Sequence, residues 1–336
     1  MFSIYCSITF EERNIDLLAQ KNRYMNKELW QGIFPALVTP FTAEDTIDFD
    51  LFDKNLQAQV EAGITGVIVA GSLGEASTLT RAEKNELVKY AKKVLPAGMP
   101  VVLCIAEQST AEAVSIAKEA ESIGADGLMV LPPMRYKADD DETVAYFTAI
   151  ANSTSLSLMI YNNPVDYKIE VTLAMFEELA KVPNIHAIKE STRDVSNVTR
   201  LFNRFGDRFS VFCGVDTLIM EEVMLGVDGV VGGLVDAFPK ETVAIFNLVK
   251  AGQYKEALSI YRWYLPLLEL DIHPKLVQNI KLAATLMGIG SEYVRAPRLV
   301  LTGAEREHVL DVINKAIETQ PVLPEYLNLT ADETLA

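Results

Sequence analysis

Two side chains in the 336-residue sequence have the types and the spacing that imine chemistry on a keto acid requires. Lys189 ends the apolar run 184–189, and Tyr161 ends the preceding apolar run, 156–161. If both runs are parallel strands, their carboxyl ends meet at one edge of the sheet, and the amine and the phenol face one pocket. An amine there can add to a carbonyl carbon, and a phenol can carry protons during the dehydration that follows.

Lys189 taken alone has two interpretations. A lysine at a strand end most often extends its ammonium group into water. Alternation along the strand, however, predicts that Ile185 and Ala187 share its inward face, so that the amine emerges from an apolar interior that disfavours the charged form. We therefore expect a nucleophilic amine. For Tyr161 the alternative to a proton carrier is an aromatic plug at the mouth of a barrel.

A turn of small residues supplies a third element of the expected site. It reads Gly71-Ser72-Leu73-Gly74-Glu75 and follows the apolar run 66–70. Backbone amides in such a turn can hold a carboxylate group. The alternative is a tight connection from a strand to a helix, without a ligand.

The elements that would position these residues are short β-branched runs that alternate with amphipathic helices. Eight parallel strands with nearly continuous apolar runs need cover on both faces, which favours a closed (β/α)8 TIM barrel over an open doubly wound sheet. The expected strands are 33–38, 66–70, 101–105, 127–131, 156–161, 185–189, 209–213 and 229–231.

After the eighth unit the sequence predicts helices only, which we interpret as the last barrel helix and a three-helix C-terminal appendix. These helices are expected over 240–251, 255–268, 274–288 and 304–318. The predicted organisation is an N-terminal extension (1–29), a catalytic barrel (30–251), a C-terminal helical region (252–320) and a tail (321–336). For the extension two interpretations stay open, a poorly ordered segment before a true start at Met25 or an amphipathic helix over 15–21.

Composition and charge exclude several classes of function. The net charge of −16 and the pI of about 4.7 disfavour a nucleic acid partner. The sequence has no apolar stretch of the length that a membrane span needs. Cys6, Cys104 and Cys213 are odd in number and widely spaced, which is typical of a reducing compartment. We expect a cytoplasmic protein.

The sequence requires no cofactor and no metal. Phosphate-loop, dinucleotide-binding and zinc-protease motifs are absent. His186, His273 and His308 are far apart and are expected to be structural or solvated, with His186 facing the helix layer. The acidic run 139–142 is interpreted as a capped helix start.

Four ordered segments resemble those of the dihydrodipicolinate synthase / N-acetylneuraminate lyase family of Schiff-base-forming lyases, over residues 30–320. They are GIFPALVTPF (32–41), GSLGE (71–75), YNNP (161–164) and IKESTRD (188–194). The resemblance implies that Lys189 forms an imine with a small 2-oxo acid, that Tyr161 relays protons, and that Ser72 links Tyr161 to solvent or substrate. It also implies that the amides of Ser72 and Leu73 bind the carboxylate, that Glu75 braces the turn, and that the protein is a homotetramer.

Departures from the synthase pattern bear on the substrate. In dihydrodipicolinate synthases an arginine follows the Tyr-Asn-x-Pro motif and pairs with the second substrate's carboxylate, whereas this sequence has Val165 and Asp166. Lys168 is a possible substitute, although it offers a point charge in place of a bidentate fork. Leu73 replaces a threonine of the synthase turn. Tyr136 marks a shift or loss of the tyrosine that a neighbouring subunit contributes in the synthase, and it is kept as a candidate substrate contact.

The segments are most similar to the hydroxyproline-catabolic branch, which implies a 1-pyrroline-4-hydroxy-2-carboxylate deaminase that gives 2-oxoglutarate semialdehyde and ammonia. One alternative is an aldolase or dehydratase for 2-oxo-3-deoxy sugar acids, in which Ser191, Asp216 and Gly233 would hold hydroxyl groups. A second is 4-hydroxy-tetrahydrodipicolinate synthase. The non-enzymatic alternative is a metabolite sensor, which retention of both Lys189 and Tyr161 disfavours.

Overall fold

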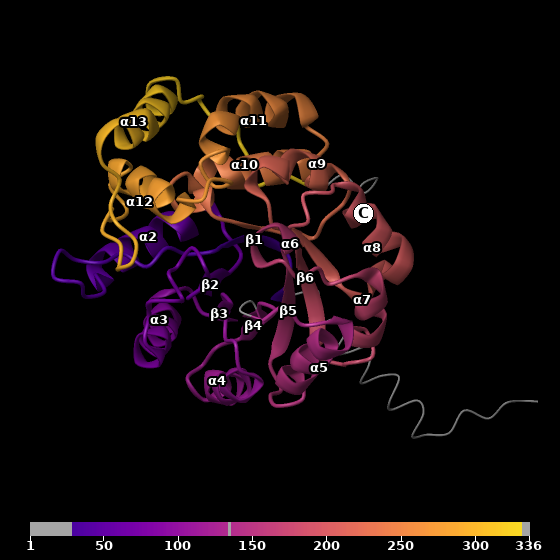
Figure 1. The fold of residues 1–336 in the computed structure, drawn as a ribbon. Helices are drawn as coiled ribbons and strands as arrows, with labels where there is room; N and C mark the ends of the chain where they lie inside the picture. Colours follow the sequence, from indigo (N-terminus) through magenta and orange to yellow (C-terminus); the bar gives the residue numbers. More distant parts are fainter. Residues whose placement is uncertain (1–28, 134–135, 331–336) are drawn as a thin grey trace, which may run out of the picture.

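The computed structural model describes residues 29–133 and 136–330. Within them, eight parallel strands form one sheet in the order β1-β8-β7-β6-β5-β4-β3-β2 (Figure 1). A parallel bridge between Ala36 and Ile68 joins the two end strands, which confirms the predicted closed TIM barrel. The strands are β1 (Gly32–Pro35), β2 (Val67–Val69), β3 (Val101–Ile105), β4 (Gly127–Val130), β5 (Ser157–Asn162), β6 (Ile185–Glu190), β7 (Ser210–Cys213) and β8 (Gly229–Gly232).

Helices lie around the barrel, and the last three gather with α10 on one side of it (Figure 1). The four C-terminal helices agree with their predicted bounds to within two residues at each end. The α-helices are α2 (Phe49–Ala62), α3 (Arg81–Val94), α4 (Thr110–Ser122), α5 (Asp140–Ala151), α6 (Pro164–Tyr167), α7 (Leu173–Leu179), α8 (Ser196–Phe205), α9 (Ile219–Met224), α10 (Pro239–Lys250), α11 (Tyr254–Leu268), α12 (Leu276–Leu286) and α13 (Gly303–Glu318). Short 3-10 segments are η1 (Gly206–Arg208), η2 (Asp216–Leu218) and η3 (Leu234–Asp236).

The barrel interior is a separate core whose amino end is filled by aromatic rings. Trp30, Phe34 and Phe212 are fully buried, and their ring centroids lie 5.6–6.3 Å apart. A second core packs the outer faces of the strands against the helices. Because large rings close the amino end, the space for a ligand lies at the opposite, carboxyl end of the barrel.

The register between β5 and β6 is irregular, and it overturns one prediction about the inward face. Ile185 pairs with Leu158, whereas the next pair is Ala187 with Met159, so β6 has one extra residue at this point. Ala187 therefore lies in the barrel interior, but Ile185 belongs to the outer core. The prediction that both share the inward face of Lys189 was wrong for Ile185.

His186, the extra residue, lies at the amino end of the barrel and not in the helix layer as predicted. Its Nδ1 is 2.7 Å from Ser157 Oγ, which also accepts a hydrogen bond of 2.6 Å from the indole N–H of Trp30. Burial and the nearby Arg208 lower the pKa of His186 to about 4, so the ring is neutral near pH 7. The shift of register reversed the alternation on which the prediction depended.

Helix α5 begins with a capping box, as the acidic run 139–142 predicted. Asp139 caps α5, since its side chain accepts from the Glu142 amide at 2.9 Å while Glu142 accepts from the Asp139 amide at 3.1 Å. His308 is exposed on α13.

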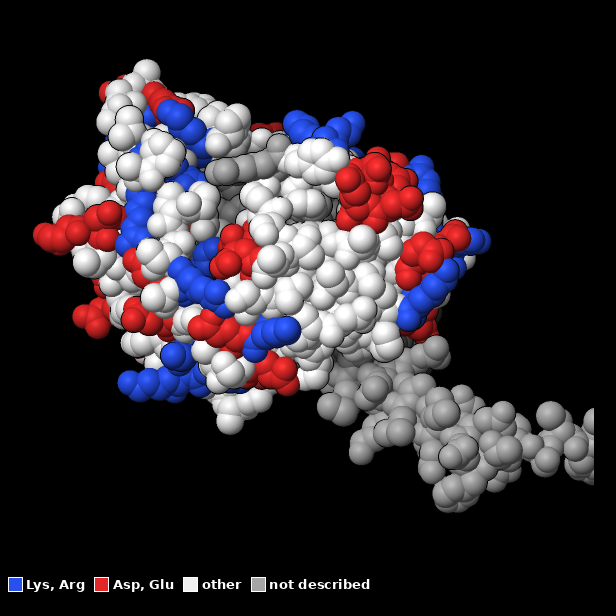
Figure 2. All heavy atoms as spheres, turned by 60° about the horizontal axis from the view of Figure 1, so that its bottom comes forward, with Lys and Arg blue, Asp and Glu red and all other residues white. Residues whose placement is uncertain are grey.

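Acidic and basic side chains are interspersed in small groups over the face shown in Figure 2. The described residues on that face therefore form no extended patch of purely positive or purely negative charge.

The ends of the chain differ in how far they are described. Residues 321–330 form neither helix nor strand, and the carbonyl of Tyr326 accepts a hydrogen bond from the side chain of Asn247 on α10. The predictions for the extension, including Met25 and a helix over 15–21, fall on residues outside the described ranges. Among the described helices, none combines the length and the apolar character that a membrane crossing needs.

Candidate active site

Lys189 and Tyr161 lie side by side at the carboxyl end of the barrel. They occupy paired positions of β6 and β5, and Lys189 Nζ lies 4.1 Å from the centroid of the Tyr161 ring. The two residues are 6% and 8% exposed. Both line a pocket of about 440 Å³. An amine and a phenol therefore face one enclosed space, which is the arrangement that the strand ends predicted.

Gly214 and Glu190 hold the strand end that carries Lys189. A Cβ atom on Gly214 would lie 2.7 Å from Lys189 Cγ and 2.8 Å from the Glu190 carbonyl, so a side chain at this position would displace the lysine. The buried Glu190 carboxylate accepts hydrogen bonds from Asn197 at 3.0 Å and from Asn162 at 3.3 Å. Together these contacts fix the backbone from which the amine extends.

Asn163 orients the hydroxyl group of Tyr161. Its amide oxygen accepts from the Asp166 backbone N–H at 3.1 Å, so its amide nitrogen is the donor to the Tyr161 hydroxyl at 3.1 Å. The same nitrogen donates to the Asp166 carboxylate at 2.7 Å. Because the Tyr161 oxygen accepts from Asn163, its own proton is directed elsewhere.

A second phenol, Tyr167, lies beside the first. The hydroxyl groups of Tyr167 and Ser72 are 2.6 Å apart, and the Tyr167 ring meets the Tyr161 ring edge-on with centroids 5.4 Å apart. Tyr167 also lines the pocket. Burial, followed by the nearby Tyr161, raises the pKa of Tyr167 well above its ordinary value, so this phenol is protonated in the resting site.

Glu75, the last residue of the Gly71–Glu75 turn, anchors this turn to the C-terminal helix α12. Glu75 Oε1 lies 2.6 Å from Lys281 Nζ on α12, and both side chains are completely buried. Within the described residues the backbone amides of Ser72 and Leu73 have no hydrogen-bond partner, and both residues line the pocket. These amides are therefore available for a carboxylate, and Glu75 has the bracing role that the resemblance implies.

Two carboxyl groups face the other half of the pocket. Asp216 accepts backbone N–H bonds from Gly233 at 3.0 Å and Leu234 at 2.7 Å. A Cβ atom on Gly233 would lie 2.4 Å from Asp271 Oδ1, so the absence of a side chain at Gly233 makes room for Asp271. Burial and the neighbouring Asp216 raise the pKa of Asp271 well above its usual range, and burial also raises that of Asp216. Ser191 also lines the pocket, and its hydroxyl donates a hydrogen bond to the Gly214 carbonyl at 2.9 Å.

Arg193 supplies a cation at the mouth of the pocket. It lines the pocket, has a left-handed backbone with φ of 64°, and has no hydrogen bond or ion pair to the described residues. Lys168, the possible substitute for the synthase arginine, donates instead to the Val165 carbonyl in its own turn and does not line the pocket. A role for Lys168 as that substitute is therefore not supported.

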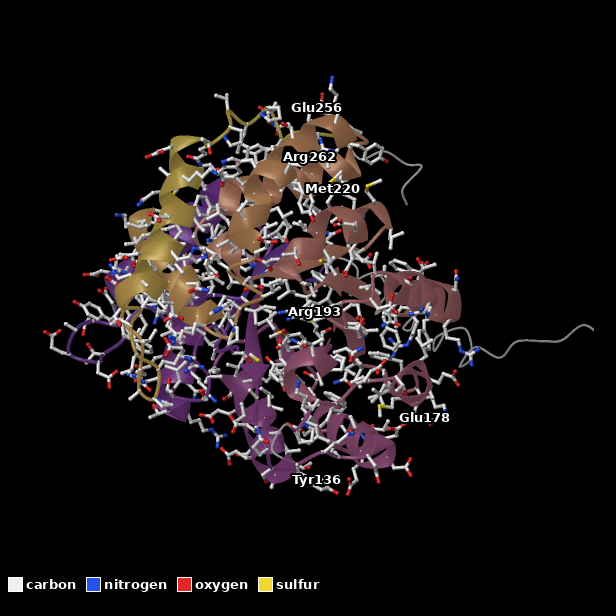
Figure 3. All side chains as sticks on the ribbon, turned by 45° about the horizontal axis from the view of Figure 1, so that its top comes forward. Tyr136, Glu178, Arg193, Met220, Glu256 and Arg262 are labelled. Atoms are coloured by element: carbon white, nitrogen blue, oxygen red, sulfur yellow. The ribbon has the colours of Figure 1, made fainter. Side chains whose placement is uncertain are left out.

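Tyr136 does not join the other predicted site residues. It is 62% exposed, its hydroxyl donates to the Glu142 carboxylate at 2.9 Å, and it is absent from the pocket lining. In Figure 3 it lies at the outer edge of the molecule, whereas Arg193 lies near the centre of the barrel mouth. Its role as a substrate contact is therefore not supported within this chain, because the helix cap of α5 engages its hydroxyl.

The residues that the sequence analysis missed are Asn163, Tyr167, Arg193, Gly214 and Asp271. One of them had a usable signal, since Asn163 followed by Pro164 is a typical helix start and places Tyr167 one turn farther along. His273, expected to be structural or solvated, is exposed and lines the pocket. Asp271 and His273 lie in the connection from α11 to α12, whose path over the barrel has no local sequence signal.

Comparisons with known proteins match this architecture. The model of the dihydrodipicolinate synthetase family matches residues 29–316. The 4-hydroxy-tetrahydrodipicolinate synthase of Exiguobacterium sibiricum is 33% identical over 291 residues, covering 85% of this chain and 97% of the relative. That of Kosmotoga olearia is 32% identical over 298 residues, covering 88% of this chain and 100% of the relative.

Solved structures agree. The 4-hydroxy-tetrahydrodipicolinate synthase of Methylacidiphilum fumariolicum SolV superposes with a TM-score of 0.81 at 28% identity, covering 86% of this chain and 96% of the other. The dihydrodipicolinate synthase DapA-2 of Bacillus anthracis gives 0.81 at 27% identity, with 87% and 99% covered. With the barrel, the paired lysine and tyrosine and the family match over residues 29–316 together, this chain belongs to the dihydrodipicolinate synthetase family.

Proposed function

We propose that Lys189 captures a small 2-oxo acid or cyclic imino acid as an imine in the pocket, as expected of a Schiff-base lyase of this family. The observation that carries the proposal is the position of Lys189 Nζ, 4.1 Å from the Tyr161 ring inside a pocket of about 440 Å³. The free amides of Ser72 and Leu73 offer a site for the substrate carboxylate, which would place C2 between the turn and the lysine.

For the specific reaction we propose deamination of 1-pyrroline-4-hydroxy-2-carboxylate. Lys189 adds to C2, the bond from C2 to the ring nitrogen breaks, and the ring opens to a lysine imine. A proton leaves C3, the 4-hydroxyl departs as water, and tautomerisation followed by hydrolysis frees ammonia and 2-oxoglutarate semialdehyde. This substrate carries one carboxylate, which suits a pocket whose distal half presents Asp216 and Asp271.

The second candidate is 4-hydroxy-tetrahydrodipicolinate synthase, in which pyruvate on Lys189 condenses with aspartate semialdehyde. Two observations favour it over the deaminase. The relatives reported above carry this name. Arg193 also offers a guanidinium group at the pocket mouth for a second carboxylate, although Asp166, an acid, stands where the synthases have their arginine. A sugar acid substrate has less support, because Ser191 and Asp216 already bond to the backbone.

Parallel assays of the purified protein separate these candidates. Ammonia release from the cyclic imino acid is the expected result, and condensation of pyruvate with aspartate semialdehyde without ammonia release would establish the second candidate instead. A 2-oxo-3-deoxy sugar acid is assayed as the third substrate, and its turnover in place of the other two would establish the aldolase or dehydratase. Borohydride reduction in the presence of pyruvate or of the cyclic imino acid should add the mass of the reduced adduct to Lys189, and absence of both adducts would favour a non-covalent metabolite sensor.

A further inference from the structure

We infer that Tyr167 is a proton-relay residue of the imine chemistry, acting through Ser72, so that both phenols of the relay come from one chain. The inference rests on the proposed capture of substrate by Lys189, which it deepens by adding a residue to that site. It follows from the 2.6 Å contact between the Tyr167 and Ser72 hydroxyl groups and from the edge-on contact of the Tyr167 and Tyr161 rings.

The short helix α6 places Tyr167 and controls Tyr161 at the same time. Asn163 caps the helix by accepting from the Asp166 amide, and its side chain also donates to the Tyr161 hydroxyl. Pro164 occupies the first turn, and Lys168 ends the helix with φ of 64°. Tyr167 is therefore held one turn from the residue that orients Tyr161, and the geometry of the two phenols is coupled.

The two phenols reach the reacting carbon along different routes. Tyr161 lies directly beside Lys189, whereas Tyr167 reaches the pocket through Ser72, whose neighbour Leu73 offers the carboxylate-binding amide. A hydroxyl on either side of C2 allows one group to accept a proton from the attacking amine while the other donates to the departing oxygen.

The proton balance with pyruvate assigns each hydroxyl a step. Lys189 Nζ forms the bond to C2, and the carbonyl oxygen takes a proton from Ser72, which Tyr167 replaces. Tyr161 gives its hydroxyl proton to the same oxygen and takes a proton from the attached nitrogen in exchange. The bond from C2 to that oxygen then breaks, water leaves, and the imine remains. Tyr167 regains its proton from water in the pocket that it lines.

The test measures how fast pyruvate becomes trapped on Lys189 by borohydride, with the full chain and intact-protein mass as the readout. Tyr167→Phe keeps the ring against Tyr161 and removes only the hydroxyl. We expect the trapping rate to fall about 100-fold, with the same final adduct mass and the same half-saturating pyruvate concentration. Tyr254→Phe at the start of α11, whose hydroxyl has no hydrogen bond to the described residues, is the matched control with the wild-type rate.

Ser72→Ala and the double variant separate a relay from simple support. If Ser72 and Tyr167 act as one unit, the double variant traps pyruvate about as slowly as either single variant. Losses that multiply, or a Tyr167→Phe rate within twofold of wild type, would overturn the inference while leaving capture by Lys189 intact. Wild-type protein that traps no pyruvate and no cyclic imino acid would overturn the proposed function itself, and the relay with it.

Discussion

Lys281 of α12 and Glu75 of the Ser72 turn form an ion pair with an N–O distance of 2.6 Å, although they are 206 residues apart. Both side chains are completely buried. Lys281 also donates to the Tyr293 carbonyl, and Glu75 accepts from the Arg295 amide at 3.1 Å. The C-terminal helices are therefore part of the support for the Gly71–Glu75 turn at the mouth of the barrel.

Lys281→Met should destabilise the fold strongly and also weaken binding at the turn. Removing the lysine leaves the buried Glu75 carboxylate with only the longer ion pair to Arg298, at 3.6 Å, and breaking a buried pair in this way costs about 3–5 kcal/mol of unfolding free energy. Urea unfolding measures this loss. The double variant Glu75→Gln with Lys281→Met should recover a substantial part of it, because no buried charge remains. A loss below about 1 kcal/mol in the single variant would contradict a supporting role for the pair.

Gly214→Ala should slow imine formation strongly with a modest loss of stability. The new methyl group would lie 2.7 Å from Lys189 Cγ and 2.1 Å from Ser191 Oγ, so the lysine or its strand end must move. Overpacking of this kind costs about 1–3 kcal/mol. A displacement of about 1 Å is expected to slow trapping of pyruvate about 100-fold. A variant that melts like the wild type and traps pyruvate at an unchanged rate would refute this account of Gly214.

His186 should make the protein less stable as the pH falls from about 6.5 to about 4. Its pKa in the folded state is lowered to about 4, below the ordinary 6.5, so the unfolded chain takes up its proton first as the pH falls. Unfolding free energies of wild type and His186→Gln, measured at several pH values, isolate this effect. The difference between them should shift in favour of the variant over that window by up to about 3 kcal/mol. Parallel curves would contradict the assignment.

The strand ends could be predicted from the sequence because their chemistry is local to one apolar run each. Lys189 and Tyr161 are the last or nearly last residues of their strands, and alternation over two residues was enough to place them. The predicted side-chain directions of Ile185 and His186 were wrong because the pairing register between β5 and β6 changes there. The extra residue at His186 reversed the alternation, and no propensity within the run 184–189 indicates an irregular pairing with β5.

The distal half of the pocket could not be predicted, because its groups arrive through tertiary contacts. Asp271 belongs to a connection after α11, and it has room in the pocket because Gly233, directly after β8, has no side chain. Arg193 lies in the segment 188–194, yet its left-handed backbone, with φ of 64°, has no local sequence signal in an arginine.

Asp271→Asn should separate capture of the substrate from the later loss of water. Deamination requires a proton on the departing 4-hydroxyl, and burial together with the adjacent Asp216 raises the pKa of Asp271 well above its usual range, so that this carboxyl can donate one. The charged groups that influence it are Asp216, Lys189, Asp166 and Arg193. We expect ammonia release to fall about 100-fold while the borohydride adduct with pyruvate still forms.

In the wild type, ammonia release should decline as the pH rises through the elevated pKa of Asp271, and the variant should lack this decline. Equal ammonia release by both proteins would show that Asp271 donates no proton.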